Sequence, residues 1–282
     1  MSASNWPLGL SSCGSQGMER AVFQGYAQAG IRYMEVSLDA CRYAALDLDA
    51  PKNYAQEAGV RLWSIHLPFN REFYNIAHLD SSRRVACLLE YCRLLEKASK
   101  AGISVAVVHP SSEPIDGAER ALAMRQAKQS LRALAQAADG LGLVVAVENL
   151  PRTCLGRDAA EMLELLDADR RLMSCFDTNH LLTQSLEDYL QALAGRIATL
   201  HVSDYDFVDE KHVLPGEGKI AWPSLLAKLR QIGYEGPFLY ELGLGSTSHI
   251  RRPKPLRYED FAANYAALLR GQIPAPQGDV LF

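Results

Sequence analysis

Short apolar runs rich in β-branched and aromatic residues recur along the whole chain, and segments with helical periodicity lie between them. The eight runs are Leu8–Leu10, Ile31–Val36, Val60–Ile65, Ile103–Val108, Leu143–Val147, Arg171–Phe176, Ile197–Leu200 and Pro237–Tyr240. The helical segments include Ser81–Ala101, Ala118–Ala138, Asp158–Leu166, Leu186–Leu193, Trp222–Ile232 and Tyr258–Leu269. Several runs follow a glycine that can end a helix in the left-handed conformation, such as Gly30 and Gly102. The pattern predicts strands and helices that alternate from end to end.

An alternating chain of this kind folds with its strands parallel and covered on both faces. Eight sequential strand–helix units provide that cover by closing into a barrel inside a ring of helices. The main alternative, a doubly wound open sheet, usually carries a glycine-rich phosphate loop after its first strand, and the segment after Leu10 matches neither the dinucleotide nor the P-loop spacing. No low-complexity stretch or linker divides the 282 residues. We therefore predict an α/β fold, a single-domain (β/α)8 TIM barrel over residues 1–282.

Charge and cysteine usage limit the partners and the compartment. Lys and Arg total 29 against 33 Asp and Glu, so the net charge of −4 gives no overall attraction for nucleic acid or anionic membranes. No apolar run approaches the roughly 18 residues that span a bilayer, and the start lacks a basic segment followed by an apolar one. The six cysteines include no Cys-x-x-Cys pair. We expect a cytoplasmic protein without a membrane partner, and nucleic acid is a disfavoured partner.

A titratable side chain lies at the end of seven of the eight apolar runs or directly after it. These residues are Glu35, His66, His109, Glu148, Asp177, His201 and Glu241. Their separations of 31, 43, 39, 29, 24 and 40 residues each match about one strand–helix unit, so barrel closure brings all seven to one rim. That rim is the carboxyl-terminal face, where barrel enzymes carry their active sites.

So many ionisable groups at the mouth of a low-dielectric barrel repel one another unless a cation or shared protons compensate. We predict that one divalent metal ion does so, bound by Glu148, Asp177, His201 and Glu241. Three carboxylates and one imidazole offer mainly oxygen donors, which favours Mn²⁺, also suits Mg²⁺ or Co²⁺, and tolerates Zn²⁺.

Other conspicuous residues are expected to serve the fold. Strand alternation predicts that Trp63 faces away from the histidine three residues later and toward the helix layer. Glu35 is expected to pair with an arginine, and His78 and His249 to lie in loops or on the surface. The turn-rich tail 274–282 is expected either to fray or to pack against a neighbouring copy, which leaves a homo-oligomer open.

Five short motifs together resemble one enzyme superfamily. They are Val147-Glu148-Asn149, the run from Cys175 to His180, the run from His201 to Asp206, Leu214-Pro215-Gly216-Glu217-Gly218 and Tyr240-Glu241. In order and spacing they resemble the xylose-isomerase-like barrels, particularly the sugar phosphate isomerase/epimerase group with its ketose 3-epimerases and inosose-processing enzymes. The resemblance implies a small carbohydrate or cyclitol substrate, one divalent metal on the four residues given above, and substrate contact by His180.

A second branch of that superfamily, the apurinic-site endonucleases with three zinc ions, resembles a further part of the chain. The matching residues are His66, His109 and Glu148 for one additional Zn²⁺, and His180, Glu210 and His212 for another. The last set departs from that branch, because a glutamate stands where its Asp-x-His pair has an aspartate. The loop Leu214–Gly218 and the negative net charge also favour the sugar enzymes, so this function ranks second.

The expected chemistry is the movement of a proton next to a carbonyl through an enediolate, whose charge the metal stabilises. We predict that Glu148 and Glu241, three strands apart in the ring, act as the acid/base pair from different sides. The remaining candidates are His180, His212 and Glu210 for substrate binding, His66 and His109 for substrate or a second ion, and Arg152 and Lys211 for a phosphate. Epimerisation, isomerisation and dehydration of a keto-polyol stay open, as does a sugar-binding barrel without catalysis.

Overall fold

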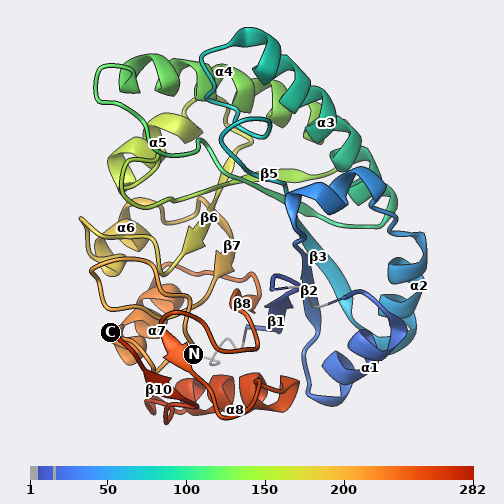
Figure 1. Cartoon of the computed structure of the whole chain (residues 1–282), viewed down its shortest axis with the longest axis vertical. Helices are drawn as coiled ribbons and strands as arrows, with labels where there is room; N and C mark the ends of the chain where they lie inside the picture. The colour runs from blue at the N-terminus through green and yellow to red at the C-terminus, as the bar shows by residue number, and fades with distance from the viewer. Residues whose placement is uncertain (1–5, 15–16) are drawn as a thin grey trace.

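The computed structural model describes residues 6–14 and 17–282, so residues 1–5 and 15–16 of the predicted domain lie outside the described residues. Eight parallel strands form a barrel with the helices outside it (Figure 1). The strands are β1 (Leu8–Ser11), β2 (Tyr33–Val36), β3 (Arg61–His66), β4 (Val105–Val108), β5 (Val144–Glu148), β6 (Met173–Asp177), β7 (Ile197–His201) and β8 (Phe238–Tyr240). Each strand begins within two residues of the start of a predicted apolar run. The predicted TIM barrel is confirmed.

The ring of strands closes through the residue that follows β7. Neighbouring strands pair in chain order from β7 back to β1, and β1 pairs with β8. Across the remaining gap, the Val202 N–H donates to Leu239 O (2.8 Å), and the Val202 carbonyl accepts from the Glu241 N–H (3.1 Å). Closure therefore sets the ends of β7 and β8 side by side, with His201 and Glu241 on them.

Helices follow the strands around the outside of the barrel (Figure 1). They are α1 (Arg20–Gln28), α2 (Asp49–Ala58), α3 (Ser81–Lys100), α4 (Arg120–Asp139), α5 (Ala159–Leu166), α6 (Leu186–Ala192), α7 (Trp222–Gln231) and α8 (Tyr258–Leu269), with a short 3₁₀ helix η1 (Ala40–Ala45) after β2. Side-chain caps start several of them: the Asp80 carboxylate accepts from the Ser82 N–H before α3. Among the described residues, no helix has the length and apolar character needed to cross a membrane.

One layer below the strand ends, the barrel interior is apolar. Trp63 packs against a small cluster made of Val105, Val107, Ala146 and Cys175. The indole Nε1–H of Trp63 donates to Thr199 Oγ1 across the barrel (3.1 Å). The prediction that Trp63 faces the helix layer is wrong, because the pairing of β2 with β3 shifts by one residue between Met34 and Glu35. Trp63 is the extra residue of this β-bulge, and a bulge interrupts the alternation of faces.

The C-terminal tail folds onto its own chain. β10 (Asp279–Val280) pairs antiparallel with β9 (Ile250–Arg251), a short strand in the segment after β8. The Gln277 N–H donates to Glu217 Oε1 (2.9 Å), which ties the tail to the segment after β7 as well. Fraying, one of the two expected states, is therefore wrong for these residues, whereas packing against a neighbouring copy stays a prediction.

Candidate functional site

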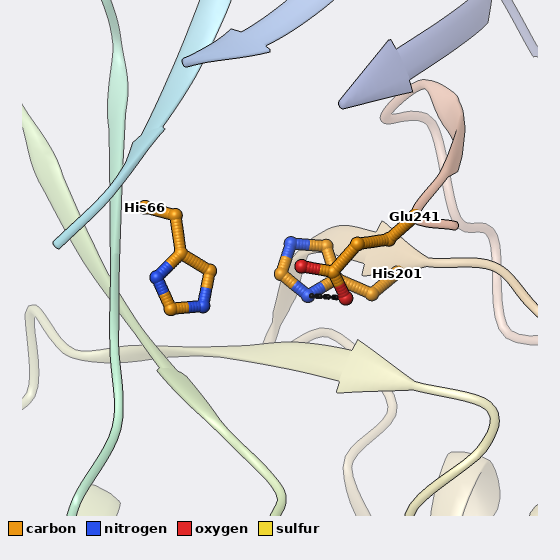
Figure 2. Close-up of side chains that lie close together, drawn as sticks. All are labelled: His66, His201 and Glu241. Carbon is orange, nitrogen blue, oxygen red and sulfur yellow. Dashed lines mark ion pairs between the residues drawn. The ribbon is translucent and has the colours of Figure 1, made fainter. Parts of the chain in front are cut away.

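The carboxyl ends of the strands open into a cavity of about 590 Å³. His66, His109, Glu148 and Glu241 line it, and His201 and Asp177 lie fully buried beneath them. Figure 2 shows the His66 and His201 rings and the Glu241 carboxylate, from β3, β7 and the residue after β8, turned toward one another. The structure therefore gathers the strand-end residues on one rim, as barrel geometry requires.

The centre of the rim is a cluster of three carboxylates and one imidazole. One ligand atom from each of Glu148, Asp177, His201 and Glu241 lies within 4.8 Å of all the others. The His201 Nδ1 atom is 3.1 Å from Glu148 Oε1 and 3.0 Å from Glu241 Oε2. Asp177 Oδ2 is buried and accepts no hydrogen bond from any described residue, although His180 Nδ1 lies 3.6 Å away. A buried carboxylate oxygen without a hydrogen bond, placed among further carboxylates, fits a divalent cation, because such a cation accepts mainly oxygen ligands.

The electrostatics of this cluster follow from burial and from the neighbouring histidines. Burial raises the pKa of the Asp177 carboxyl to about 7. Burial also disfavours ionised Glu148 and Glu241, but nearby histidines, His201 first, outweigh it. The pKa of Glu148 therefore lies well below its ordinary value, and the pKa of Glu241 falls to about 2. In the absence of a metal ion, histidine protons balance the carboxylates, so a bound cation would take over their role.

A second group of ligand atoms faces the other oxygen of Glu148. His66 Nε2 and His109 Nε2 each lie 3.1 Å from Glu148 Oε2. The His66 Nδ1–H donates to the carbonyl of Leu67 (2.8 Å), which leaves Nε2 to face the carboxylate. Burial opposes a charged His66, but Glu148 raises the pKa of this imidazole to about 9, whereas burial lowers the pKa of His109. This arrangement could hold either a second cation or a substrate oxygen.

A third group comes from the segments after β6 and β7, with His180 on the first and Glu210 and His212 on the second. His180 Nε2 is 3.1 Å from Glu210 Oε2, and His212 Nε2 is 3.8 Å from the same oxygen. The His180 Nδ1–H donates to the carbonyl of Asn149 (2.9 Å), so its Nε2 points at Glu210. Burial opposes a charged His180, yet Asp177 and Glu210 raise its pKa to about 10. The side chains predicted to bind substrate are thus together and adjacent to the central cluster.

Several expectations for single residues are wrong. Glu35 pairs with His201 Nε2 (3.0 Å) rather than with an arginine, since closing the barrel brings β7 across from β2. Arg152 is no phosphate clamp: its guanidinium contacts Glu113, Asp209 (2.5 Å) and Glu210 (2.7 Å), so three carboxylates occupy it.

Two cavity residues escaped sequence reasoning. His249 lies in a loop, as expected, but it also lines the cavity, because the segment after β8 folds back toward the rim. The Phe69 ring, also in the cavity wall, stacks on His109 with ring centroids 4.0 Å apart. Phe69 lies in an irregular loop without periodicity, so its position depends on the loop conformation alone.

Comparisons with known proteins agree with this geometry. The family model described as "Xylose isomerase-like TIM barrel" matches residues 23–259. An uncharacterized protein of Methanocaldococcus jannaschii is 28% identical over 200 residues, which cover 66% of this chain and 68% of that one. The fructoselysine 3-epimerase of Escherichia coli O157:H7 is 27% identical over 133 residues, 45% of this chain and about half (47%) of that enzyme.

A likeness among solved structures concerns the fold. The crystal structure of a D-tagatose 3-epimerase-like protein superimposes with a TM-score of 0.77 at 20% identity, and the match covers 94% of this chain and 96% of that one. Sugar epimerases are therefore among the proteins that share this barrel. Since the family model spans most of the chain, the protein belongs to the xylose isomerase-like TIM barrel family.

Proposed function

We propose that the protein is a metal-dependent epimerase or isomerase of a small sugar, sugar phosphate or cyclitol. The observation that carries this proposal is the central cluster, in which the buried Asp177 Oδ2 accepts no hydrogen bond from the described residues and lies beside Glu148, His201 and Glu241. The epimerase names among the relatives and structural neighbours support the reaction class. The cavity volume of about 590 Å³ lies in the usual range for small-molecule sites.

The proposed ligands of one divalent ion are Glu148, Asp177, His201 and Glu241. Their donor set favours Mn²⁺ and is compatible with Co²⁺, Mg²⁺ or Zn²⁺. A bound ion would supply positive charge where the enediolate charge develops.

Proton transfer is assigned to Glu148 and Glu241. They lie after β5 and β8 on different parts of the ring, and both carboxylates line the cavity. One removes the carbon-bound proton and the other returns a proton. Return to the opposite face of the same carbon gives epimerisation, and return to the neighbouring carbon gives isomerisation. Elimination of a β-hydroxyl from the same intermediate gives dehydration, a third outcome of this constellation.

Substrate binding is assigned to the polar and aromatic cavity wall. His180, His212 and Glu210 present hydrogen-bonding groups on one side of the cavity, and His66 and His109 on the other. The Phe69 ring stacked on His109 adds an apolar surface suited to the carbon face of a sugar ring.

The test is solvent exchange at the substrate carbon, followed by NMR in D₂O with a panel of ketoses, inososes and their phosphates. The Glu148→Gln and Glu241→Gln variants are expected to lose exchange, because an amide cannot accept the carbon-bound proton. Glu164→Gln, on the exposed face of α5, is the matched control and keeps exchange. Wild-type exchange in both site variants would remove the assignment of the acid/base pair. Tight binding of a panel member without exchange or turnover would instead identify a sugar-binding barrel.

A zinc phosphodiesterase acting on apurinic sites in DNA is the second candidate. It is favoured by the two histidine-containing groups, His66–His109–Glu148 and His180–Glu210–His212, whose ligand atoms within each group lie within 4.8 Å of one another. Elemental analysis of the purified protein separates the two functions. Roughly three zinc ions per chain support the nuclease, and one divalent ion supports the sugar enzyme.

A further inference from the structure

Glu35, at the end of β2, is a completely buried carboxylate that neither the proposed metal ligands nor the acid/base pair includes. Its Oε1 accepts from the Ser11 hydroxyl (3.0 Å) on β1, and its Oε2 accepts from the Ser64 hydroxyl (2.8 Å) on β3. The same Oε2 lies 3.0 Å from His201 Nε2 on β7. A carboxylate in such a dry position costs folding free energy unless its partners compensate, so its presence calls for a role.

The strand register places a serine on each side of Glu35. Ser11 is the β1 partner of Glu35, and Ser64 is its β3 partner. Ser64 takes that place because the β-bulge at Trp63 shifts the β3 register by one residue. Hydroxyl donors from both neighbouring strands thus fix the carboxylate, and its orientation toward His201 is set before any ligand binds.

The two nitrogens of His201 have different surroundings. Nε2 faces Glu35 Oε2 (3.0 Å), whereas Nδ1 faces Glu148 Oε1 (3.1 Å) and Glu241 Oε2 (3.0 Å). Without a metal ion both nitrogens face carboxylates and both can carry a proton. A cation at Nδ1 would displace the proton there, and because a carboxylate can only accept, the Glu35 contact would keep the remaining proton on Nε2. The Nδ1 lone pair then points into the cluster of carboxylates, where a cation would stabilise it.

We propose that Glu35 is a positioning residue that holds the His201 tautomer and ring orientation so that Nδ1 is the metal-binding atom. The proposal rests on the metal-dependent function proposed above. A carboxylate behind a ligating imidazole orients the ring and increases its basicity, and losing it typically costs 10–100-fold in metal affinity. Glu35 acts through His201 and does not contact the substrate.

The test is a calorimetric Mn²⁺ titration of the full-length protein after chelator treatment. Glu35→Gln keeps the side-chain shape and an acceptor oxygen but removes the charge, and Glu35→Leu removes both. We expect Mn²⁺ to bind about tenfold more weakly to Glu35→Gln and up to about 100-fold more weakly to Glu35→Leu. Metal-free Glu35→Leu should unfold at a lower urea concentration than the wild type, because the Ser11 and Ser64 hydroxyls and His201 lose their buried acceptor, whereas Glu35→Gln keeps an acceptor oxygen and should lose less stability.

The matched control is Asp204→Asn. Asp204 is another fully buried carboxylate, and it accepts from the Trp222 indole N–H (2.8 Å) without contacting His201. This substitution should lower folding stability and leave Mn²⁺ affinity unchanged, which is the behaviour of a structural carboxylate.

A spectroscopic readout reports the tautomer directly. In ¹⁵N-histidine NMR of the protein loaded with diamagnetic Zn²⁺, His201 is expected to carry its proton on Nε2 and the metal on Nδ1. Glu35→Leu should lose this pattern, and Glu35→Gln should retain it in part.

The outcomes separate the two proposals. Wild-type Mn²⁺ affinity and a wild-type NMR pattern in both Glu35 variants would overturn the role of Glu35 and leave the metal site standing. A wild-type protein that binds Mn²⁺ no better than its Asp177→Asn variant would overturn the metal site and the role of Glu35 together. If Glu35→Leu fails to fold, the isosteric Glu35→Gln still decides the matter.

Discussion

Two sets of buried charges in this barrel differ in how they are compensated. Arg252 and Glu217 form a buried bidentate ion pair: Nη1 donates to Oε1 and Nη2 donates to Oε2, each at 2.7 Å. The backbone N–H groups of Leu214 and Gln277 donate to the same carboxylate. At the barrel mouth, by contrast, three carboxylates surround one imidazole, and Asp177 Oδ2 accepts no hydrogen bond within the described part of the chain. The charges of this pair match one to one, although Arg252 Nε has no hydrogen-bond partner among the described residues, whereas the central cluster holds an excess of carboxylates that a cation from outside can balance.

Substitution of Asp177 should have the largest effect on activity. Its replacement by asparagine should lower turnover by about 10²- to 10⁴-fold and weaken metal binding, because a carboxylate ligand is lost. Burial raises the pKa of Asp177 to about 7. Ionisation of this carboxyl therefore lowers the stability of the metal-free fold. Asp177→Asn should therefore unfold in urea at the same or a higher concentration than metal-free wild type. Clear destabilisation of the metal-free variant would show that the central cluster stabilises the fold, as the Arg252–Glu217 pair does.

The Arg252–Glu217 pair should behave in the opposite way: breaking it should destabilise the fold. Arg252→Ala leaves Glu217 buried without its cation, which should lower the free energy of unfolding by about 3–5 kcal/mol. The loss should be the same with and without divalent metal, as measured by urea denaturation. Arg251→Ala, an exposed neighbour on β9, is the control and should change stability little. A loss that metal restores would contradict the separation of the two sets.

The pH dependence of stability sharpens the comparison further. The folded-state pKa is raised to about 9 for His66, which faces Glu148, and to about 10 for His180, which faces Asp177 and Glu210. A raised histidine pKa stabilises the fold below the unfolded value near 6.5, and this contribution disappears as the pH rises through the folded value. Metal-free protein should therefore lose at least about 1 kcal/mol between pH 7 and pH 9 in urea titrations.

Bound metal provides the check on this expectation. A cation that replaces the histidine protons should make stability nearly independent of pH over the same range. Equal slopes for metal-free and metal-loaded protein would argue that these histidines do not compensate the central carboxylates.

The exposed ion pairs of Arg171 should contribute least to folding stability. Arg171 contacts Asp169 (2.7 Å) and Asp139 (2.9 Å) outside the barrel, and its hydrogen bonds lower the pKa of Asp169 to about 2. Water already solvates these charges well, so Arg171→Ala should leave the urea midpoint at pH 7 nearly unchanged in the same denaturation assay. A clear drop in this midpoint would place this surface network closer to the buried Arg252–Glu217 pair.

The barrel and its rim were predictable because both follow from local pattern and one closure rule. A run such as Val105–Val108 must be a buried strand, and the polar His109 that follows must lie at its end. Once eight such units close, chain spacing alone gathers Glu148, Asp177 and the other strand-end residues.

What escaped prediction depends on contacts between distant segments. The bulge that turns Trp63 inward is a property of how β2 and β3 pair, and no run of residues encodes it. The Glu35–His201 contact joins residues 166 positions apart and exists because the barrel closes. Arg152 and Phe69 lie in loops, where conformation follows from side-chain contacts rather than from periodicity.

The position of β8 between β1 and β7 has a consequence for biosynthesis. Until Phe238–Tyr240 has been synthesised, β1 has no partner on one side, and Glu241, the last proposed ligand, does not yet exist. A nascent chain on the ribosome would offer a metal ion only three of the four ligands, in an open sheet accessible to water. Completion of the barrel and retention of its cation should therefore occur as one late event.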